Sequence, residues 1–308
     1  MTTFPAQNAP SSPGSPALRG VSELRSFASL LNPGAMAADL WGRRALIWQF
    51  ALRSVGERNR GSHLGLLWTV LQPLLMLGVY TFVFAVVWQA KWGLGEGGAG
   101  TSSFALTVFA GLLLFEVFGA SVGQAPSLVV SNPNYVKKVV FPLEVLPVAS
   151  VVAATLLAGI SVCVLLTSKA LLGAGAFGGE GARVSATLYM FPLVLPALVS
   201  LAAGVSMALA AVGVFLRDIR PLVQGMLLQV LFFMTPIFYP IERVPGAFRA
   251  VLAWNPLAVV VESGRRTLVM GRAPDWFALG VVTLAGLVVL QVGYAVFMKS
   301  KRGFADVL

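Results

Sequence analysis

The chain has 308 residues, of which 57% are hydrophobic and only 11% are charged, and its formal net charge is +10. Soluble domains carry about 25% charged residues, so this composition excludes an ordinary soluble protein and predicts an all-α integral membrane protein whose apolar surface faces lipid. The positive charge does not indicate a nucleic-acid partner, because membrane proteins concentrate Lys and Arg at their cytoplasmic flanks. The single cysteine, Cys163, excludes an intrachain disulfide.

The N-terminal region contains two segments of different character. Residues 1–35 are rich in Pro, Ser, Ala and Gly and lack the compact apolar stretch of a signal peptide, so we expect a disordered cytoplasmic tail. In residues 36–60, apolar side chains recur at alternating steps of three and four, which predicts an amphipathic helix along the inner membrane interface. This stripe consists of Ala38, Trp41, Ala45, Trp48, Leu52 and Val55.

Residues 61–308 contain six windows that are long and apolar enough to cross a bilayer, which takes about 20 residues. Six spans place both termini on the same side of the membrane. That side also carries the larger share of the Lys and Arg residues, so we expect both termini in the cytoplasm. The predicted spans are residues 64–90, 104–125, 143–168, 186–216, 221–241 and 276–298.

The segment between the fifth and sixth spans has a different pattern. Its uncharged run, residues 250–261, is too short to span the bilayer and contains Asn255-Pro256. Treating this run as a seventh span would also move the basic C-terminal tail to the outer side. We therefore predict an outer re-entrant helical hairpin over residues 245–272.

The sequence contains no motif for nucleotide binding or metal binding. No G-x-x-x-x-G-K-S/T sequence occurs, so ATP is not bound through a P-loop, and the lone histidine, His63, excludes a histidine-based metal site within one chain. We predict a protein that is not an enzyme and has no catalytic residue, metal or cofactor of its own. Glu116 lies inside a span without intramembrane Lys, Arg or His to pair with, which argues against an ion-coupled carrier. It is expected to face either a hydrated cavity or a partner helix.

Aromatic residues gather near the outer ends of two spans, and two interpretations are open. They could form the interfacial aromatic belt of a membrane protein, or they could line a path on which sugar rings stack. Tyr80, Phe84 and Trp88 are four residues apart, which places them on one face of an α-helix. The second group is Phe232, Phe233, Phe238 and Tyr239.

Several ordered motifs resemble those of the membrane subunits of ABC exporters for polysaccharides and polyol phosphates, which export O-antigen, capsule and teichoic acid. The resemblance runs from about Ala38 to the C-terminus. One departure is Glu116, where the family more often has a neutral polar residue. The motifs are RNRGSHLGLLW at 58–68, KKVVFPLEVLP at 137–147, FLRDI at 215–219, TPIFY at 235–239, and NPL at 255–257 followed by Glu262 and Arg265.

The resemblance implies a homodimer of six-span subunits, each docked on a cytoplasmic P-loop ATPase that binds ATP and Mg. Spans one and five would line a channel at the dimer interface. Three cytosolic segments would pass ATPase movements to the channel: the interface helix, the 126–139 loop and the 217–220 turn. The residues expected to act in this coupling are Arg58, Arg60, Lys137, Lys138, Arg217 and Asp218. The last two have an alternative role in capping their own turn.

These features predict the permease subunit of an ATP-driven exporter in the inner membrane of a Gram-negative bacterium. Its expected cargo is a lipid-linked polysaccharide, most directly O-antigen for lipopolysaccharide biosynthesis. Within the same family, the alternatives are export of capsular polysaccharide or teichoic acid, or of a drug or lipid. An ion-coupled carrier would need paired intramembrane charges, and a membrane enzyme would need clustered polar groups near one interface. Neither pattern is visible in the sequence. 

Overall fold

A computed structural model describes residues 32–58, 63–65, 67–87, 101–137, 141–173, 186–239, 241 and 244–308. Every regular element in these ranges is helical, which confirms the all-α class. In chain order, with η marking 3₁₀- and π-helices, they are α2 (Pro33–Gly42), α3 (Arg44–Arg58), α4 (Leu67–Thr81), η1 (Phe82–Val87), α5 (Thr101–Leu128), α6 (Pro133–Lys137), α7 (Val145–Gly173), η2 (Ala186–Leu193), α8 (Leu195–Phe215), α9 (Ile219–Leu222), η3 (Val223–Leu227), α10 (Leu228–Met234), α11 (Gly246–Ala253), α12 (Pro256–Arg265), η5 (Arg266–Met270), α13 (Trp276–Ser300), η6 (Lys301–Gly303) and α14 (Phe304–Val307).

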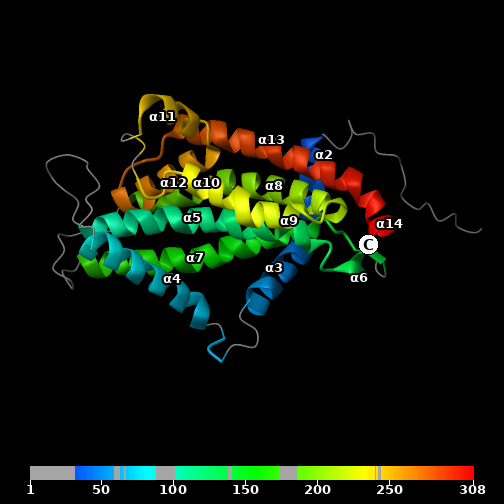
Figure 1. Ribbon diagram of the computed structural model, residues 1–308, viewed down its shortest axis with the longest axis horizontal. Coiled ribbons are helices and arrows are strands. Elements are labelled where there is room, and N and C mark those ends of the chain that lie inside the picture. Colours follow the sequence, from blue (N-terminus) through cyan, green and yellow to red (C-terminus); the bar gives the residue numbers. More distant parts are fainter. Residues whose placement is uncertain are drawn as a thin grey trace, which may run out of the picture.

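The long helices α5, α7, α8 and α13 run side by side along the long axis of the molecule (Figure 1). Helix α5 is the central element, because it packs against α7, α8, α4 and α12 and is buried along most of its length. Figure 1 shows α11 at one end of this bundle, and α14 with the C-terminus at the opposite end.

Four helical stretches are long and apolar enough to cross a membrane, and each overlaps one of the predicted spans. Their apolar composition on all sides is typical of helices that face either protein or lipid around their whole circumference. These four stretches correspond to the second, third, fourth and sixth predicted spans. They extend over Phe104–Leu128, Val145–Leu171, Ala186–Phe215 and Trp276–Val307.

The first and fifth predicted spans correspond to shorter apolar helices, Leu67–Thr81 and Ile219–Met234. The first continues as the π-helical η1. The second has a π-helical turn in its middle and ends before Pro236, which has no N–H to extend a helix. The total of six spans therefore stays a prediction.

The segment predicted as a re-entrant hairpin contains α11 and α12, joined by a turn at Trp254-Asn255. Asn255 begins α12, because its side-chain oxygen accepts a hydrogen bond from the backbone N–H of Leu257 (3.0 Å) and a proline occupies the first helical position. The helical hairpin is thus present, whereas its insertion into the membrane stays a prediction.

The N-terminal helix differs from its prediction in two respects. Residues 36–60 were expected to form one helix, but α2 ends at Gly42 and α3 begins at Arg44. Helix α2 also begins at Pro33, inside the segment assigned to the tail, because Asn32 caps it by accepting from the backbone N–H groups of Gly34 and Ala35. Residues 1–31, the rest of the predicted tail, lie outside the described residues.

Helix α3 presents apolar side chains on two sides. Ile47 and Ala51 are buried in a cluster with the first three turns of α7. Most of the predicted interfacial stripe lies on another side, where Trp48 and Leu52 are exposed, and Trp41 of α2 is exposed as well. Val55 of the stripe instead packs against the cluster with α7. The exposed stripe is thus separate from the side that docks α3 on the bundle.

Candidate functional site

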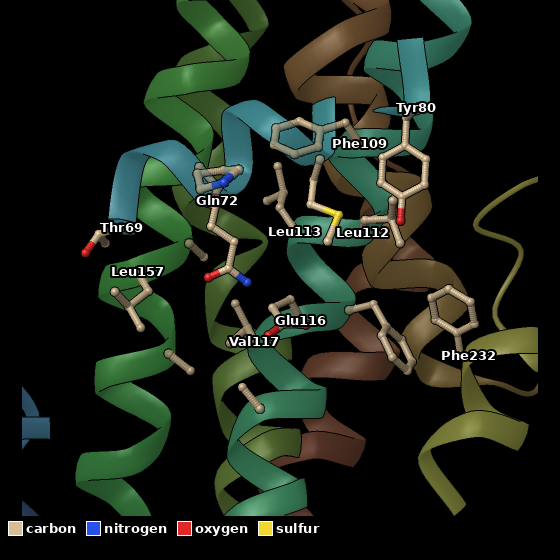
Figure 2. Close-up of a pocket in the computed structure, with 17 residues that line it drawn as sticks. Thr69, Gln72, Tyr80, Phe109, Leu112, Leu113, Glu116, Val117, Leu157 and Phe232 are labelled. Carbon is tan, nitrogen blue, oxygen red and sulfur yellow. The ribbon is translucent and has the colours of Figure 1, made fainter. Parts of the chain in front are cut away.

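A pocket of about 350 Å³ opens between α4, α5, α7 and α10 (Figure 2). Its volume falls within the range of about 300–1,000 Å³ that is usual for small-molecule sites. The walls are mainly apolar, with a few hydroxyl, amide and carboxyl groups. They consist of Thr69, Gln72, Pro73, Met76 and Tyr80; Phe109, Leu112, Leu113, Phe115, Glu116, Val117 and Ala120; Ala154, Leu157, Ala158 and Ser161; and Phe232.

Aromatic rings from four segments meet on one side of the pocket. The rings of Phe115 and Phe232 contact edge to face, with centroids 5.3 Å apart. Phe238 extends the group, since its ring lies 5.4 Å from that of Phe232 and 6.4 Å from that of Tyr80. Edge-to-face and tilted pairs at these distances are favourable arrangements of aromatic rings. The pocket therefore has a contiguous aromatic wall formed by α4, α5, α10 and the segment after α10.

Glu116 is exposed on α5, although its neighbours Phe115 and Val117 are buried. Gln72 of α4 and Glu116 of α5 both extend into the pocket (Figure 2). The Glu116 carboxylate is also close enough to interact electrostatically with Tyr80. Of the two sequence interpretations, this arrangement favours a cavity over contact with a neighbouring helix of the same chain.

The structure brings together some of the residues predicted to line a channel and separates others. Tyr80, Glu116 and Phe232 line the pocket, and Phe238 adjoins it. Phe233 points outward and is 61% exposed, while the Tyr239 hydroxyl donates to the Phe233 carbonyl oxygen (2.9 Å). Whether any of these residues contacts a substrate stays a prediction.

The expected common face of Tyr80, Phe84 and Trp88 assumed a continuous α-helix. In the structure α4 ends at Thr81, and Phe84 lies in the π-helical η1. The continuous α-helix that this common face assumed therefore does not extend beyond Thr81, and the common face stays a prediction. Trp88 lies outside the described residues.

The residues predicted to couple the chain to an ATPase occupy several short segments. Arg217 and Asp218 are exposed in the turn between α8 and α9, and the Asp218 side chain makes no cap hydrogen bond to α9. The alternative role of Asp218, in which its side chain caps the following helix, is therefore not observed. Arg58 ends α3 and Lys137 ends α6. Arg60 and Lys138 lie outside the described residues.

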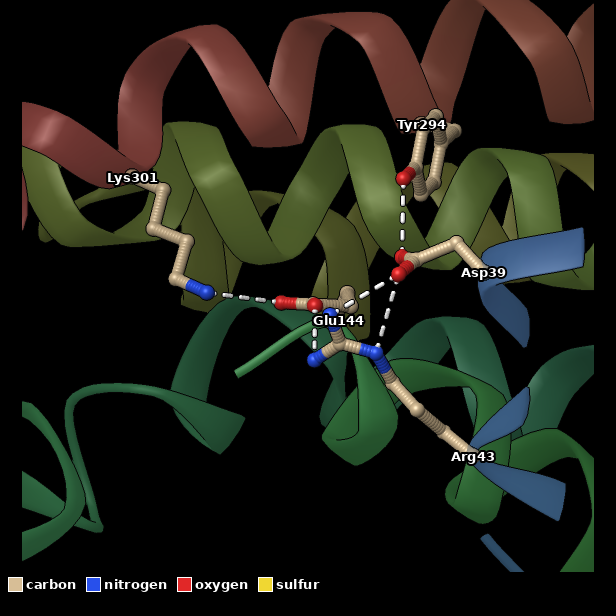
Figure 3. A network of polar contacts seen from close by, with 5 residues as sticks. All are labelled: Asp39, Arg43, Glu144, Tyr294 and Lys301. Atoms are coloured by element: carbon tan, nitrogen blue, oxygen red, sulfur yellow. Dashed lines mark hydrogen bonds and ion pairs between the residues drawn. The ribbon is translucent and has the colours of Figure 1, made fainter. Parts of the chain in front are cut away.

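A network of charged side chains joins the N-terminal helices to the bundle (Figure 3). The carboxylate of Glu144, which is fully buried, forms ion pairs with Arg43 (2.5 Å) and Lys301 (2.9 Å). Arg43 also pairs with Asp39 (2.8 Å), and the Tyr294 hydroxyl donates to the other oxygen of Asp39 (2.9 Å). The network thus links α2, the residue between α2 and α3, the start of α7, and the end of α13.

The sequence did not predict this network. Glu144 lies within the motif at 137–147 and near the start of the predicted span 143–168, and its partners are distant in the chain. The one available signal was the presence of a carboxylate beside an apolar run, because such a group needs a positive partner when it is buried.

A second polar cluster fixes the hairpin to the rest of the bundle. The Arg265 side chain is 1% exposed and donates to the backbone carbonyl oxygens of Thr107 (3.1 Å), Pro236 (2.6 Å) and Ile237. Burial lowers the pKa of Arg265 to about 10, while nearby Glu262 opposes this shift, so the guanidinium remains protonated at neutral pH. Arg265 therefore joins α12 to α5 and to the segment that follows α10.

Two neighbouring features support the attachment of the hairpin. The buried Lys169 amine at the end of α7 donates to the carbonyl oxygens of Leu268 (3.0 Å) and Val269 (2.8 Å). At Gly111 of α5, a Cβ atom would lie 2.8 Å from the Arg265 guanidinium, so a larger residue there would force the guanidinium to shift. The resemblance had pointed to Arg265 as a motif residue, but not to the carbonyl groups that it binds.

The family model of the ABC-2 type transporter matches residues 45–269, and the chain belongs to this family. It is therefore a transporter permease, and the resemblance to the membrane subunits of ABC polysaccharide exporters is confirmed.

Among its relatives, the O-antigen export system permease protein RfbA of Myxococcus xanthus is 29% identical over 274 residues, which cover 88% of this chain and 98% of the relative. A protein of the same name from Klebsiella pneumoniae is 26% identical, with coverage of 82% and 90%. The polysialic acid transport protein KpsM of Escherichia coli is 24% identical, with coverage of 80% and 90%. The chain is thus homologous to permeases named for the export of two kinds of polysaccharide.

Proposed function

We propose that this chain is the membrane-spanning subunit of an exporter that moves a lipid-linked polysaccharide, most directly O-antigen, across the bacterial inner membrane. The observation that carries this proposal is the pocket in which an aromatic wall, including Tyr80 and Phe232, stands beside the polar groups of Gln72 and Glu116. Similarity to O-antigen permeases over most of the chain supports the choice of cargo.

The two kinds of wall suit the two kinds of surface on a sugar ring. The C–H groups of a pyranose form apolar patches that pack on aromatic faces, while its hydroxyls need hydrogen-bonding partners when they leave water. Gln72 offers both donors and an acceptor, and the Glu116 carboxylate offers acceptors. Contacts of this kind are individually weak, which allows a long chain to move from one sugar unit to the next.

In this proposal a separate ATPase, which would bind ATP and Mg, supplies the energy for export. We propose that two copies of this permease form a homodimer, with one ATPase docked on the cytoplasmic side of each copy and both termini on that side. The exposed apolar faces of α4 and α10, which include Leu75, Val79, Val230 and Phe233, would be covered by lipid or by the second copy. The turn that contains Arg217 and Asp218 would contact the ATPase.

A gene deletion tests the proposed function. The account predicts that undecaprenyl-linked glycan accumulates at the cytoplasmic face, that surface glycan is lost, and that the wild-type gene restores it. The chemical nature of the stranded glycan would separate O-antigen from capsular polysaccharide. Normal surface glycan in the deletion strain would contradict the proposal.

Complementation with pocket variants tests whether the aromatic wall takes part in export. Replacing both Tyr80 and Phe232 with Ala removes two rings of the aromatic wall, and we expect surface glycan to fall about tenfold or more. The matched control is Phe277→Ala, because Phe277 of α13 is 83% exposed and lies outside the pocket. Full export by the double variant at wild-type protein levels would remove the aromatic wall from the mechanism.

A further inference from the structure

The charge of the pocket is set by one residue. Among the 17 described residues that line it, Glu116 alone carries a formal charge. The remaining polar lining consists of neutral groups, including Thr69, Gln72 and Ser161. Because a charged side chain inside a membrane span is costly, its place is usually a cavity or pathway that uses the charge.

The carboxylate can act on any group that enters the pocket. A sphere of about 350 Å³ is only about 9 Å across. A group inside the pocket therefore lies within about one Debye length of the carboxylate, which is about 8 Å at physiological ionic strength, so salt screens the field only in part. The apolar walls lower the local dielectric constant and strengthen the interaction further. A second carboxylate in this space would be repelled, whereas hydroxyl groups would find acceptors and an ammonium group would be attracted.

We propose that Glu116 makes this pocket select against acidic sugars, so that the exported glycan is built from neutral or amino sugars. The inference rests on the proposed function and goes further by naming the class of substrate. Glu116 acts here as a specificity-determining residue: its charge discriminates by repelling the wrong substrate as well as by binding the right one.

The test uses the permease purified together with its ATPase and reconstituted in proteoliposomes. Two synthetic prenyl-linked tetrasaccharides serve as probes, one of glucose and one of glucuronic acid, with the same lipid and linkages. The readout is the probe concentration that gives half-maximal stimulation of ATP hydrolysis. For the wild type, the glucuronic acid probe is expected to need at least about a tenfold higher concentration than the glucose probe.

Variants assign this preference to the carboxylate. Glu116→Gln is expected to bring the two half-maximal concentrations within about threefold, and Gln72→Glu, which adds a carboxylate from the facing helix, is expected to widen the difference. Asp306→Asn removes an exposed negative charge outside the pocket and should leave the wild-type ratio unchanged. If Glu116→Gln does not assemble with the ATPase, Gln72→Glu decides the question.

The outcomes separate this inference from the proposed function. Equal stimulation of the wild type by both probes, or an unchanged ratio in Gln72→Glu, would overturn the charge selection and leave glycan export standing. Failure of both probes to stimulate the wild type would overturn the proposed function, and the inference with it.

Discussion

At the scale of single residues, two buried charges connect segments that are distant in the sequence. Arg265 binds three backbone carbonyl oxygens from two other segments, and Glu144 pairs with Arg43 and Lys301. A buried charge is costly unless its hydrogen bonds and charge are satisfied. Each of these side chains therefore fixes its neighbours in one arrangement, because any other arrangement would leave the charge without partners.

Replacing Arg265 with Met should weaken the attachment of the hairpin. The substitution keeps an apolar side chain of similar length but removes the donors to the carbonyl groups of Thr107, Pro236 and Ile237. A buried acceptor without a partner costs about 1–3 kcal/mol, so we expect a total loss of about 2–4 kcal/mol, measured as a lower midpoint of thermal unfolding in detergent. Arg272→Met is the control, since Arg272 is exposed. Equal midpoints for both variants would contradict the role of Arg265.

Replacing Glu144 with Gln should loosen the N-terminal helices. The amide has no charge to offer Arg43 and Lys301, whose side chains are 31% and 30% exposed, so water compensates part of the loss. We expect a cost of about 1–3 kcal/mol, together with faster proteolysis within α2 and α3. Glu57→Gln is the control, because the Glu57 pair with Arg53 is exposed and contributes little. Proteolysis at the same rate in both variants would show that the network does not hold α2.

At the scale of elements, α8 and α13 approach each other closely. A Cβ atom on Gly293 would lie 2.1 Å from the carbonyl oxygen of Gly204, and one on Gly204 would lie 2.5 Å from the backbone of Leu290. Small residues permit such close approach of helices, which in a membrane depends on packing rather than on the hydrophobic effect. These glycines thus set the distance between the fourth and sixth predicted spans.

The substitution Gly293→Ala tests this contact. The added methyl group collides with backbone atoms that cannot rotate away, so the two helices must move apart, and we expect a cost of about 1–3 kcal/mol. The matched control on the same helix is Gly280→Ala, because a Cβ at Gly280 meets no atom within 4 Å. Thermal unfolding of the purified variants measures the difference. An unfolding midpoint for Gly293→Ala that equals that of Gly280→Ala would refute the close packing.

At the scale of the whole molecule, hydropathy and motifs predicted the helical class, four of the membrane-spanning lengths and the family. Hydropathy could not show which way a side chain faces, because protein-facing and lipid-facing positions of a membrane helix are both apolar. Phe232 and Phe233 illustrate this, since the first lines the pocket and the second points outward. The hydrogen bonds of Arg265 were also hidden, because they are made to backbone carbonyls, which every residue has.

The pocket residues could be predicted in part. Glu116 was predicted because a charged residue inside an apolar span is costly and therefore indicates a cavity or a partner. Tyr80 and Phe232 were predicted because aromatic residues gather near the outer ends of their spans. Gln72 was missed, because a single amide in a span carries no signal in the sequence. Its importance comes from the fold, which places α4 opposite α5.

ATP-dependent translocation tests the central claim most directly. The permease and its co-purified ATPase are reconstituted in proteoliposomes that hold a prenyl-linked neutral glycan on the ATPase-facing leaflet, and its arrival on the opposite leaflet is followed with a membrane-impermeant glycosidase. The account predicts translocation that requires hydrolysable ATP and fails with the permease alone. Translocation at the same rate without ATP, or driven by a proton or sodium gradient instead, would contradict it.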